Sequence, residues 1–111
     1  MIAYRIQQAN HPTEWLLDPE RQFSTAWGVE DDVRVGISAC ESVEALAGYL
    51  AQVGVPFGLD SRIVEMECGW AEEDDVDAEL GAILVIPTRI ISETLVADHD
   101  EFDAALDAAL A

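Results

Sequence analysis

Most side chains in this sequence that could carry chemistry are carboxylates, and they fall into separated groups. Of 111 residues, 23 are Asp or Glu and five are Arg, with a formal net charge of −18. Runs of carboxylates attract basic protein surfaces and accelerate their encounter. The acidic residues that we expect to form a binding surface are Glu30, Asp31, Asp32, Glu72, Glu73, Asp74, Asp75 and Asp77.

This charge pattern favours a non-enzymatic, acidic protein-binding module with a basic protein as partner. Spaced carboxylates can imitate the phosphates of a nucleic acid and occupy the groove of a nucleic-acid-binding protein. An inhibitor or nucleic-acid mimic is the concrete form of this hypothesis. The acidity is also typical of a structural subunit adapted to its host, and the sequence leaves the oligomeric state open.

The same charge argues against several other classes of function. Phosphates of DNA or RNA and anionic membrane surfaces attract basic patches, so we expect neither direct nucleic-acid binding nor membrane binding. Residues 1–8 do not have the pattern of a signal peptide. The longest apolar run, Ala82–Pro87, is far shorter than the roughly 20 residues that span a bilayer. We therefore expect a cytoplasmic protein.

The sequence predicts neither a metal site nor a cofactor. Asp75, Asp77 and Glu79 alternate as in a calcium-binding loop. However, Leu80 and Ile86 stand where that loop requires glycine and a bidentate glutamate. We expect this run to be a solvated loop or a surface that binds a partner.

The cysteines and the second histidine have ordinary structural interpretations. Because there are only two cysteines and no export signal, we expect Cys40 and Cys68 to be reduced, with Cys68 buried in a strand. His99 lies between two aspartates, and we expect it at the start of a C-terminal helix. The sequence contains no CxxC pair, phosphate loop or HExxH motif.

Alternation of apolar and polar residues predicts the strands. Residues 2–7 alternate, which places Arg5 and Gln7 on one face of a first strand. Pro87 is expected to mark an edge, a bulge or a bend. Residues 8–32 have no sustained period, and their aromatic side chains indicate that the segment packs onto the domain. Further strands are predicted at residues 33–37, 62–68, 82–86 and 89–96.

Two helices complete the predicted fold. Ser42 and Gly54 suit the N-cap and the C′ position of a central helix between them. A C-terminal helix is predicted within residues 98–110, with an apolar stripe of Phe102, Leu106, Ala109 and Leu110. Residues 1–111 should therefore form a single α+β domain with about five mostly antiparallel strands, one central helix and one C-terminal helix.

Three short segments occur in an order that bears on function. Tyr4-Arg5-Ile6 lies on the first strand, Gly36-Ile37-Ser38 ends the second before a helix, and Asp77-Ala78-Glu79 precedes an apolar strand. This order resembles the arginine–serine–glutamate layout of ADP-ribosyltransferases. The resemblance implies that Arg5 contacts the phosphates of NAD, that Ser38 positions the nicotinamide ribose, and that Glu79 activates the reacting group.

The alternative to this resemblance gives the same residues structural roles. Arg5 is then a surface residue of the first strand, Ser38 is a turn residue, and Glu79 is one of many acids in a loop. The sequence thus leaves two classes of function open, an acidic binding module and an NAD-binding enzyme, and of the two it favours the module.

Overall fold

The computed structural model describes residues 1–111 except residues 27–28, 55 and 76, and it describes no side chains for residues 25–32. Its strands are β1 (Ile2–Gln7), β2 (Phe23–Ala26), β3 (Val29–Val35), β4 (Ile37–Ala39), β5 (Arg62–Trp70) and β6 (Ile83–Leu95). Its helices are α1 (Val43–Val53), α2 (Asp100–Leu110) and the short 3₁₀ helices η1 (Thr13–Leu17), η2 (Pro19–Arg21), η3 (Ala78–Leu80) and η4 (Val96–Asp98). The predicted α+β class is confirmed, with six strands in the described part of the chain.

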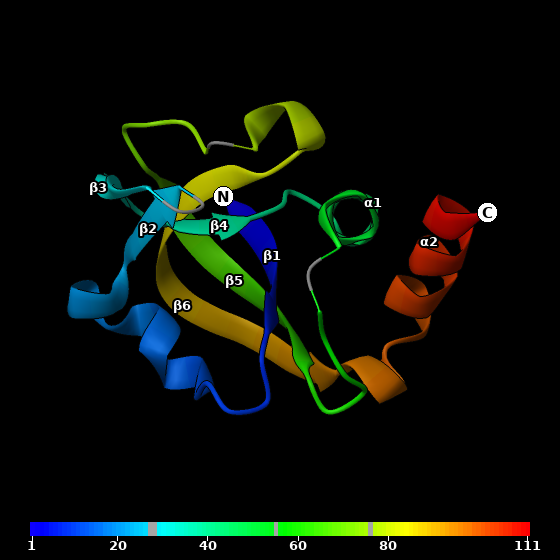
Figure 1. The fold of residues 1–111 in the computed structure, drawn as a ribbon. Coiled ribbons are helices and arrows are strands. Elements are labelled where there is room, and N and C mark those ends of the chain that lie inside the picture. Colours follow the sequence, from blue (N-terminus) through cyan, green and yellow to red (C-terminus); the bar gives the residue numbers. More distant parts are fainter. Residues whose placement is uncertain (27–28, 55, 76) are drawn as a thin grey trace.

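Four strands form one curled sheet that organises the rest of the fold. Their order is β1-β5-β6-β4, and each neighbouring pair is antiparallel. The two outer strands also meet, because Tyr4 N donates to Cys40 O at 2.8 Å and Cys40 N donates to Tyr4 O at 2.9 Å. This bridge brings the end of β4 back against β1, so the curled sheet nearly closes on itself (Figure 1).

The strand predicted at residues 33–37 is in fact two strands, divided at Gly36. Strand β3 pairs with β2 in a separate two-stranded sheet, whereas β4 pairs with β6. Gly36 has a φ of 111°, and a Cβ atom there would lie 3.0 Å from Ala71 Cβ and 3.1 Å from Val85 O. Only glycine suits both the backbone angle and the tight space. The chain can therefore pass from the hairpin into the curled sheet at this residue.

The two strands predicted on either side of Pro87 form a single strand, β6 (Ile83–Leu95). Cys68 lies opposite Pro87, while Glu67 lies opposite Arg89, so Thr88 is an extra residue on β6. The expected irregularity at Pro87 is thus a bulge. Proline has no N–H to donate, and a bulge relaxes the ladder where that donor is missing. The strand continues past the proline for this reason.

Helix α1 begins and ends where the sequence predicts. Ser42 Oγ accepts a hydrogen bond from Ala45 N at 3.0 Å, and Gly54 adopts a left-handed φ of 67°. The helix lies between the curled sheet and α2 (Figure 1). Its buried side contributes to a first hydrophobic core of Ile6, Cys40, Val43, Leu46, Ala47, Leu50, Ile63, Val96 and Phe102.

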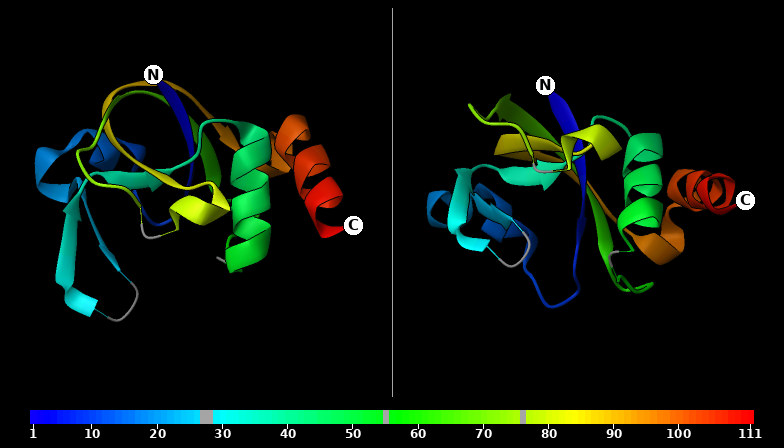
Figure 2. Two further views of the ribbon diagram at one scale, coloured as in Figure 1. Left: turned by 90° about the horizontal axis from the view of Figure 1, so that it is seen from above. Right: turned by 45° about the horizontal axis from the view of Figure 1, so that its top comes forward.

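Residues 8–32 contain η1, η2, β2 and the start of β3. Leu16 and Gln22 of this segment pack onto the domain as predicted, whereas the Phe23 side chain is 50% exposed and Trp27 lies outside the described residues. Leu16 is buried, and Gln22 Nε2 donates to Leu16 O at 2.9 Å and to Pro87 O at 3.1 Å. Figure 2 shows α1 and α2 at one end of the curled sheet and the β2–β3 hairpin at the other. Leu16 belongs to a second core with Ala3, Ile37, Ala39, Val64, Met66, Cys68 and Val85.

Helix α2 docks through its first turns only. His99 is its N-cap, and His99 Nδ1 accepts a hydrogen bond from Phe102 N at 3.1 Å, so the predicted place of His99 is confirmed. Phe102 is fully buried and Leu106 is partly buried. The predicted apolar stripe is wrong at Ala109 and Leu110, which are exposed, because no described element covers the last turn; Leu110 is 66% accessible.

Phe102 should therefore provide most of the stabilisation that α2 contributes. We expect Phe102→Ala to lower the free energy of unfolding by about 3–5 kcal/mol, because it leaves a cavity in the first core. Leu110→Ala, on the same helix, should change it by less than about 0.5 kcal/mol. Urea unfolding followed by circular dichroism measures both values, and similar losses for the two variants would contradict this account of how α2 docks.

Candidate functional site

The closure of the curled sheet brings Arg5 and Ser38 together. Arg5 follows Tyr4 on β1, and Ser38 lies two residues before Cys40, so the bridge places the two strands side by side. Arg5 Nη1 donates to Ser38 O at 2.7 Å. Ser38 lies within β4, so it is not the turn residue of the structural alternative, and Arg5 is partly accessible on β1.

Arg5 is a desolvated cation with no carboxylate in direct contact in the described structure, although the buried Asp75 lies close enough to act on its charge. Its Nε donates to Gln7 Oε1 at 3.3 Å, and no carboxylate of the described residues forms an ion pair with it within 4.0 Å. Burial lowers the pKa of Arg5, and the more distant Tyr49 and Asp75 oppose that shift. A buried charge without a close counter-charge is costly, so this position favours an anionic ligand.

Tyr49 on α1 faces the same region and links it to the acidic loop. Its hydroxyl donates to Asp77 Oδ2 at 2.7 Å, between residues 28 positions apart in the chain. Burial is the largest cause that raises the pKa of Tyr49, and the hydrogen bond to Asp77 raises it further. A hydrogen bond with the Ser38 side chain opposes this shift. Tyr49 therefore stays protonated at neutral pH and remains a hydrogen-bond donor.

The acidic loop divides between two environments. Glu72, Glu73 and Asp74 are exposed, as expected for a binding surface. Asp75 differs from that expectation, because it is only 8% accessible and its Oδ1 accepts a hydrogen bond from Asp77 N at 2.8 Å. The loop turns inward at this point, and Asp75 and Asp77 belong with Arg5 and Tyr49, not with the exposed acids.

Glu79 lies apart from this cluster. It is exposed on η3, and no hydrogen bond or ion pair joins it to another described residue. Of the three residues in the resemblance, the structure thus brings Arg5 and Ser38 into contact but leaves Glu79 outside. The backbone of Glu30, Asp31 and Asp32 lies in β3, and their side chains lie outside the described part of the structure.

A cavity of about 210 Å³ lies between β1, β4 and α1. Its walls are largely apolar, with a few converging polar groups, which is the usual composition of a small-molecule site. Sequence reasoning identified Arg5 and Ser38 but missed Tyr49 as a polar group of the site, because Tyr49 belongs to no short motif. The residues that line the cavity are Arg5, Ile6, Gln7, Gln8, His11, Ser38, Ala39, Cys40, Leu46, Tyr49 and Leu50.

The thiol in this cavity is not a nucleophile. Burial raises the pKa of Cys40 to about 12, and the Asp75 carboxylate adds to the shift. Burial likewise raises the pKa of Cys68 to about 11. Both cysteines are free and Cys68 is buried, as the sequence predicts, and Cys40 is buried as well. Because only a thiolate attacks or binds metal, both side chains act as apolar packing groups at neutral pH.

Comparison with protein-family models, with curated proteins and with solved structures finds no match to this chain. The described residues contain no group of three or more His, Cys, Asp and Glu side chains arranged to hold a metal ion. None of their helices is both long and apolar enough to cross a membrane. The function of the cavity is therefore argued from its own geometry.

The buried thiol of Cys40 should make folding stability depend on alkaline pH. In the unfolded chain the thiol ionises near its ordinary pKa of 9.0, but in the folded chain it ionises only near 12. The stabilisation is complete below pH 9 and is lost as the pH rises through the folded pKa. Between pH 8 and 10.5 we expect wild type to lose about 1–2 kcal/mol more than Cys40→Ala.

Urea unfolding at the two pH values measures this difference. Cys68→Ala should remove a similar part of the pH dependence, because the pKa of Cys68, raised to about 11, also lies above this pH range. Equal pH dependence in wild type and Cys40→Ala would contradict the assigned burial of this thiol.

Proposed function

We propose that the protein is an ADP-ribosyltransferase-like, NAD-binding protein, and that the cavity between β1, β4 and α1 holds the nucleotide. The observation that carries this proposal is Arg5, a desolvated cation that lines the cavity without a carboxylate partner in the described residues. A phosphate group would supply the missing counter-charge. The expectation of an acidic binding module thus becomes the second candidate.

Two hydrogen bonds orient the Arg5 guanidinium group for a phosphate ligand. Its bonds to Ser38 O and Gln7 Oε1 use two of the guanidinium donors and fix the plane of the group. An arginine has five N–H donors in a rigid fork, so others remain for a ligand. The buried Leu46 and Leu50 on the α1 side offer an apolar wall to a ring, and the Ser38 hydroxyl offers a partner to a ribose hydroxyl.

Within this proposal, Asp77 takes the part that the resemblance gives to Glu79. Its carboxylate is held by the Tyr49 hydroxyl beside the cavity, whereas Glu79 is exposed. Bound NAD would supply a ribose whose bond to nicotinamide can break, with nicotinamide as the leaving group and water as the nucleophile that takes its place. A fixed carboxylate near that ribose would stabilise positive charge developing on it.

Calorimetry with NAD tests the proposal directly. Wild type should bind NAD, and Arg5→Gln should weaken binding at least tenfold, because the phosphate loses its charged partner. Arg89→Gln is the matched control, since Arg89 is exposed and pairs with Glu67 at 2.9 Å on the surface. Its affinity should equal that of wild type. Absence of binding at millimolar NAD would remove the proposal.

Measurement of NAD consumption then distinguishes the roles of Asp77 and Glu79. Asp77→Asn should abolish turnover, while Glu79→Gln should retain it, provided that both variants melt at the wild-type temperature. The opposite result would return the catalytic role to Glu79.

The second candidate is the acidic module, and one observation favours it. Glu72, Glu73 and Asp74 are contiguous and exposed, and they follow Trp70, which is 59% accessible. Acids beside exposed apolar surface are typical of a protein interface. A hollow of about 540 Å³ at this place is lined by Val35, Trp70, Glu72, Glu73 and Ile86. A basic nucleic-acid-binding protein, inhibited by mimicry of phosphates, would fit such a surface.

Neutralising the three exposed acids tests this candidate. The variant Glu72→Gln, Glu73→Gln, Asp74→Asn should associate more slowly with a basic protein that co-purifies from the host, and its rate should depend less on salt. The control neutralises Asp100, Asp103 and Asp107 on α2, which are equally exposed. Equal association rates and equal salt dependence for wild type and the loop variant would exclude this loop as the recognition surface.

A further inference from the structure

A second cavity lies next to the first and shares part of its wall. Its volume is about 200 Å³, and Arg5, Gln7 and His11 line both cavities. Each cavity alone is smaller than the roughly 300–1,000 Å³ of most small-molecule sites. Because they meet at Arg5, a phosphate bound to this guanidinium would have both cavities beside it. The residues that the second cavity adds include Arg21, Trp15 and Ser24.

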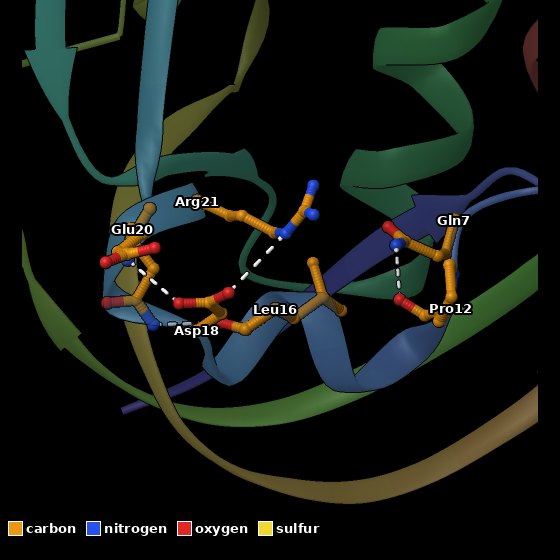
Figure 3. Close-up of polar contacts among 7 residues, drawn as sticks. Gln7, Pro12, Leu16, Asp18, Glu20 and Arg21 are labelled. Atoms are coloured by element: carbon orange, nitrogen blue, oxygen red, sulfur yellow. Dashed lines mark hydrogen bonds and ion pairs between the residues drawn. The ribbon is translucent and has the colours of Figure 1, made fainter.

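Arg21 is held in place with its terminal donors available. Its guanidinium carbon lies 3.9 Å from the centroid of the Trp15 ring, and its Nε lies 3.5 Å from Asp18 Oδ2. Stacking uses the face of the guanidinium and leaves its in-plane N–H groups unoccupied. Among the described residues, no hydrogen-bond acceptor reaches its two terminal nitrogens. Figure 3 shows the Arg21 side chain extending over Leu16 toward the side of Gln7.

Hydrogen bonds from Gln7 and Arg62 hold the segment that leads to Trp15. Gln7, which is 3% accessible, donates from Nε2 to Pro12 O at 3.2 Å and to His11 O at 3.4 Å. Figure 3 shows the first of these bonds. Arg62 Nη2 donates to Gln8 O at 3.0 Å and also to His11 O. These hydrogen bonds therefore fix the position of the segment that forms one wall of the second cavity.

The placement of positive charge points to the kind of ligand. The chain has a net charge of −18 and only five basic side chains apart from histidine. Two of them, Arg5 and Arg21, line this one cavity, and a third, Arg62, supports its loop. Paired guanidinium groups match the oxygen geometry of phosphate. In so acidic a protein, such a concentration of arginine favours a doubly anionic group.

We propose that the second cavity is a phosphate subsite, in which Arg21 binds one phosphate of a diphosphate while Arg5 binds the other. The ligand class is a nucleoside diphosphate or a dinucleotide, whose remaining part occupies the first cavity. The inference rests on the proposed function for the nucleotide in the first cavity, but the anion subsite itself follows from the arginines. It adds to the resemblance a positioning residue, Arg21, that the resemblance does not assign.

Calorimetry with three probes tests the subsite. Arg21→Gln should weaken binding of NAD and of inorganic pyrophosphate at least tenfold, because both carry a diphosphate. It should change the affinity for nicotinamide mononucleotide less than twofold, since a single phosphate is bound by Arg5. Arg21→Lys, which keeps the charge but loses the planar fork, should give an intermediate loss. Arg89→Gln is the control and should leave all three affinities unchanged.

The outcomes distinguish this inference from the proposed function. If NAD binds and Arg21→Gln binds it as wild type does, the subsite is excluded and the proposed function stands. If pyrophosphate binds in an Arg21-dependent manner and NAD does not bind, the subsite stands and the proposed function fails. If neither probe binds, both are excluded. Thermal melting of each variant at the wild-type temperature ensures that a loss reports binding and not unfolding.

Discussion

The pair of backbone hydrogen bonds between Tyr4 and Cys40 holds the architecture of the site together. It joins the first and last strands of the curled sheet, at 2.8 and 2.9 Å. Without it, β1 and β4 would be the two open edges of a four-stranded sheet, each with unpaired donors and acceptors. With it, Arg5 lies against Ser38, and α1 covers the junction with Leu46, Tyr49 and Leu50. Both cavities depend on that junction, because both have Arg5 in their wall.

The position of Arg5 is unusual for the charge balance of this protein. A chain with 23 acidic side chains has many ways to neutralise an arginine, yet no carboxylate in the described structure pairs closely with this one. The carbonyl of Ser38 and the amide of Gln7 contact it directly, while the Asp75 carboxylate acts on it from a greater distance. Neutral dipoles orient a cation but do not cancel its charge, which is why we propose an anionic ligand for this site. Arg21, stacked on Trp15, extends the same property into the second cavity.

The acidic loop shows how one run of similar residues can belong to two surfaces. Glu72, Glu73 and Asp74 face solvent beside the exposed Trp70, where they are free to attract a basic protein. Asp75 and Asp77 turn inward, where both act electrostatically on Tyr49 and Asp75 also acts on Arg5. The two proposed functions therefore use different residues of the same loop. Neutralising the outer acids leaves the inner ones in place, so the two functions can be separated by mutation.

Local signals in the sequence determine much of this fold. The caps of α1 at Ser42 and Gly54, the place of His99, and the bulge at Pro87 follow from backbone chemistry within a few residues. The alternation in residues 2–7 likewise places Arg5 and Gln7 on one face. Only the tertiary structure decides that this polar face is enclosed, that β6 continues past its proline, and that Asp77 meets Tyr49 while Glu79 does not. These outcomes depend on contacts between residues far apart in the chain, which periodicity and local propensity do not encode.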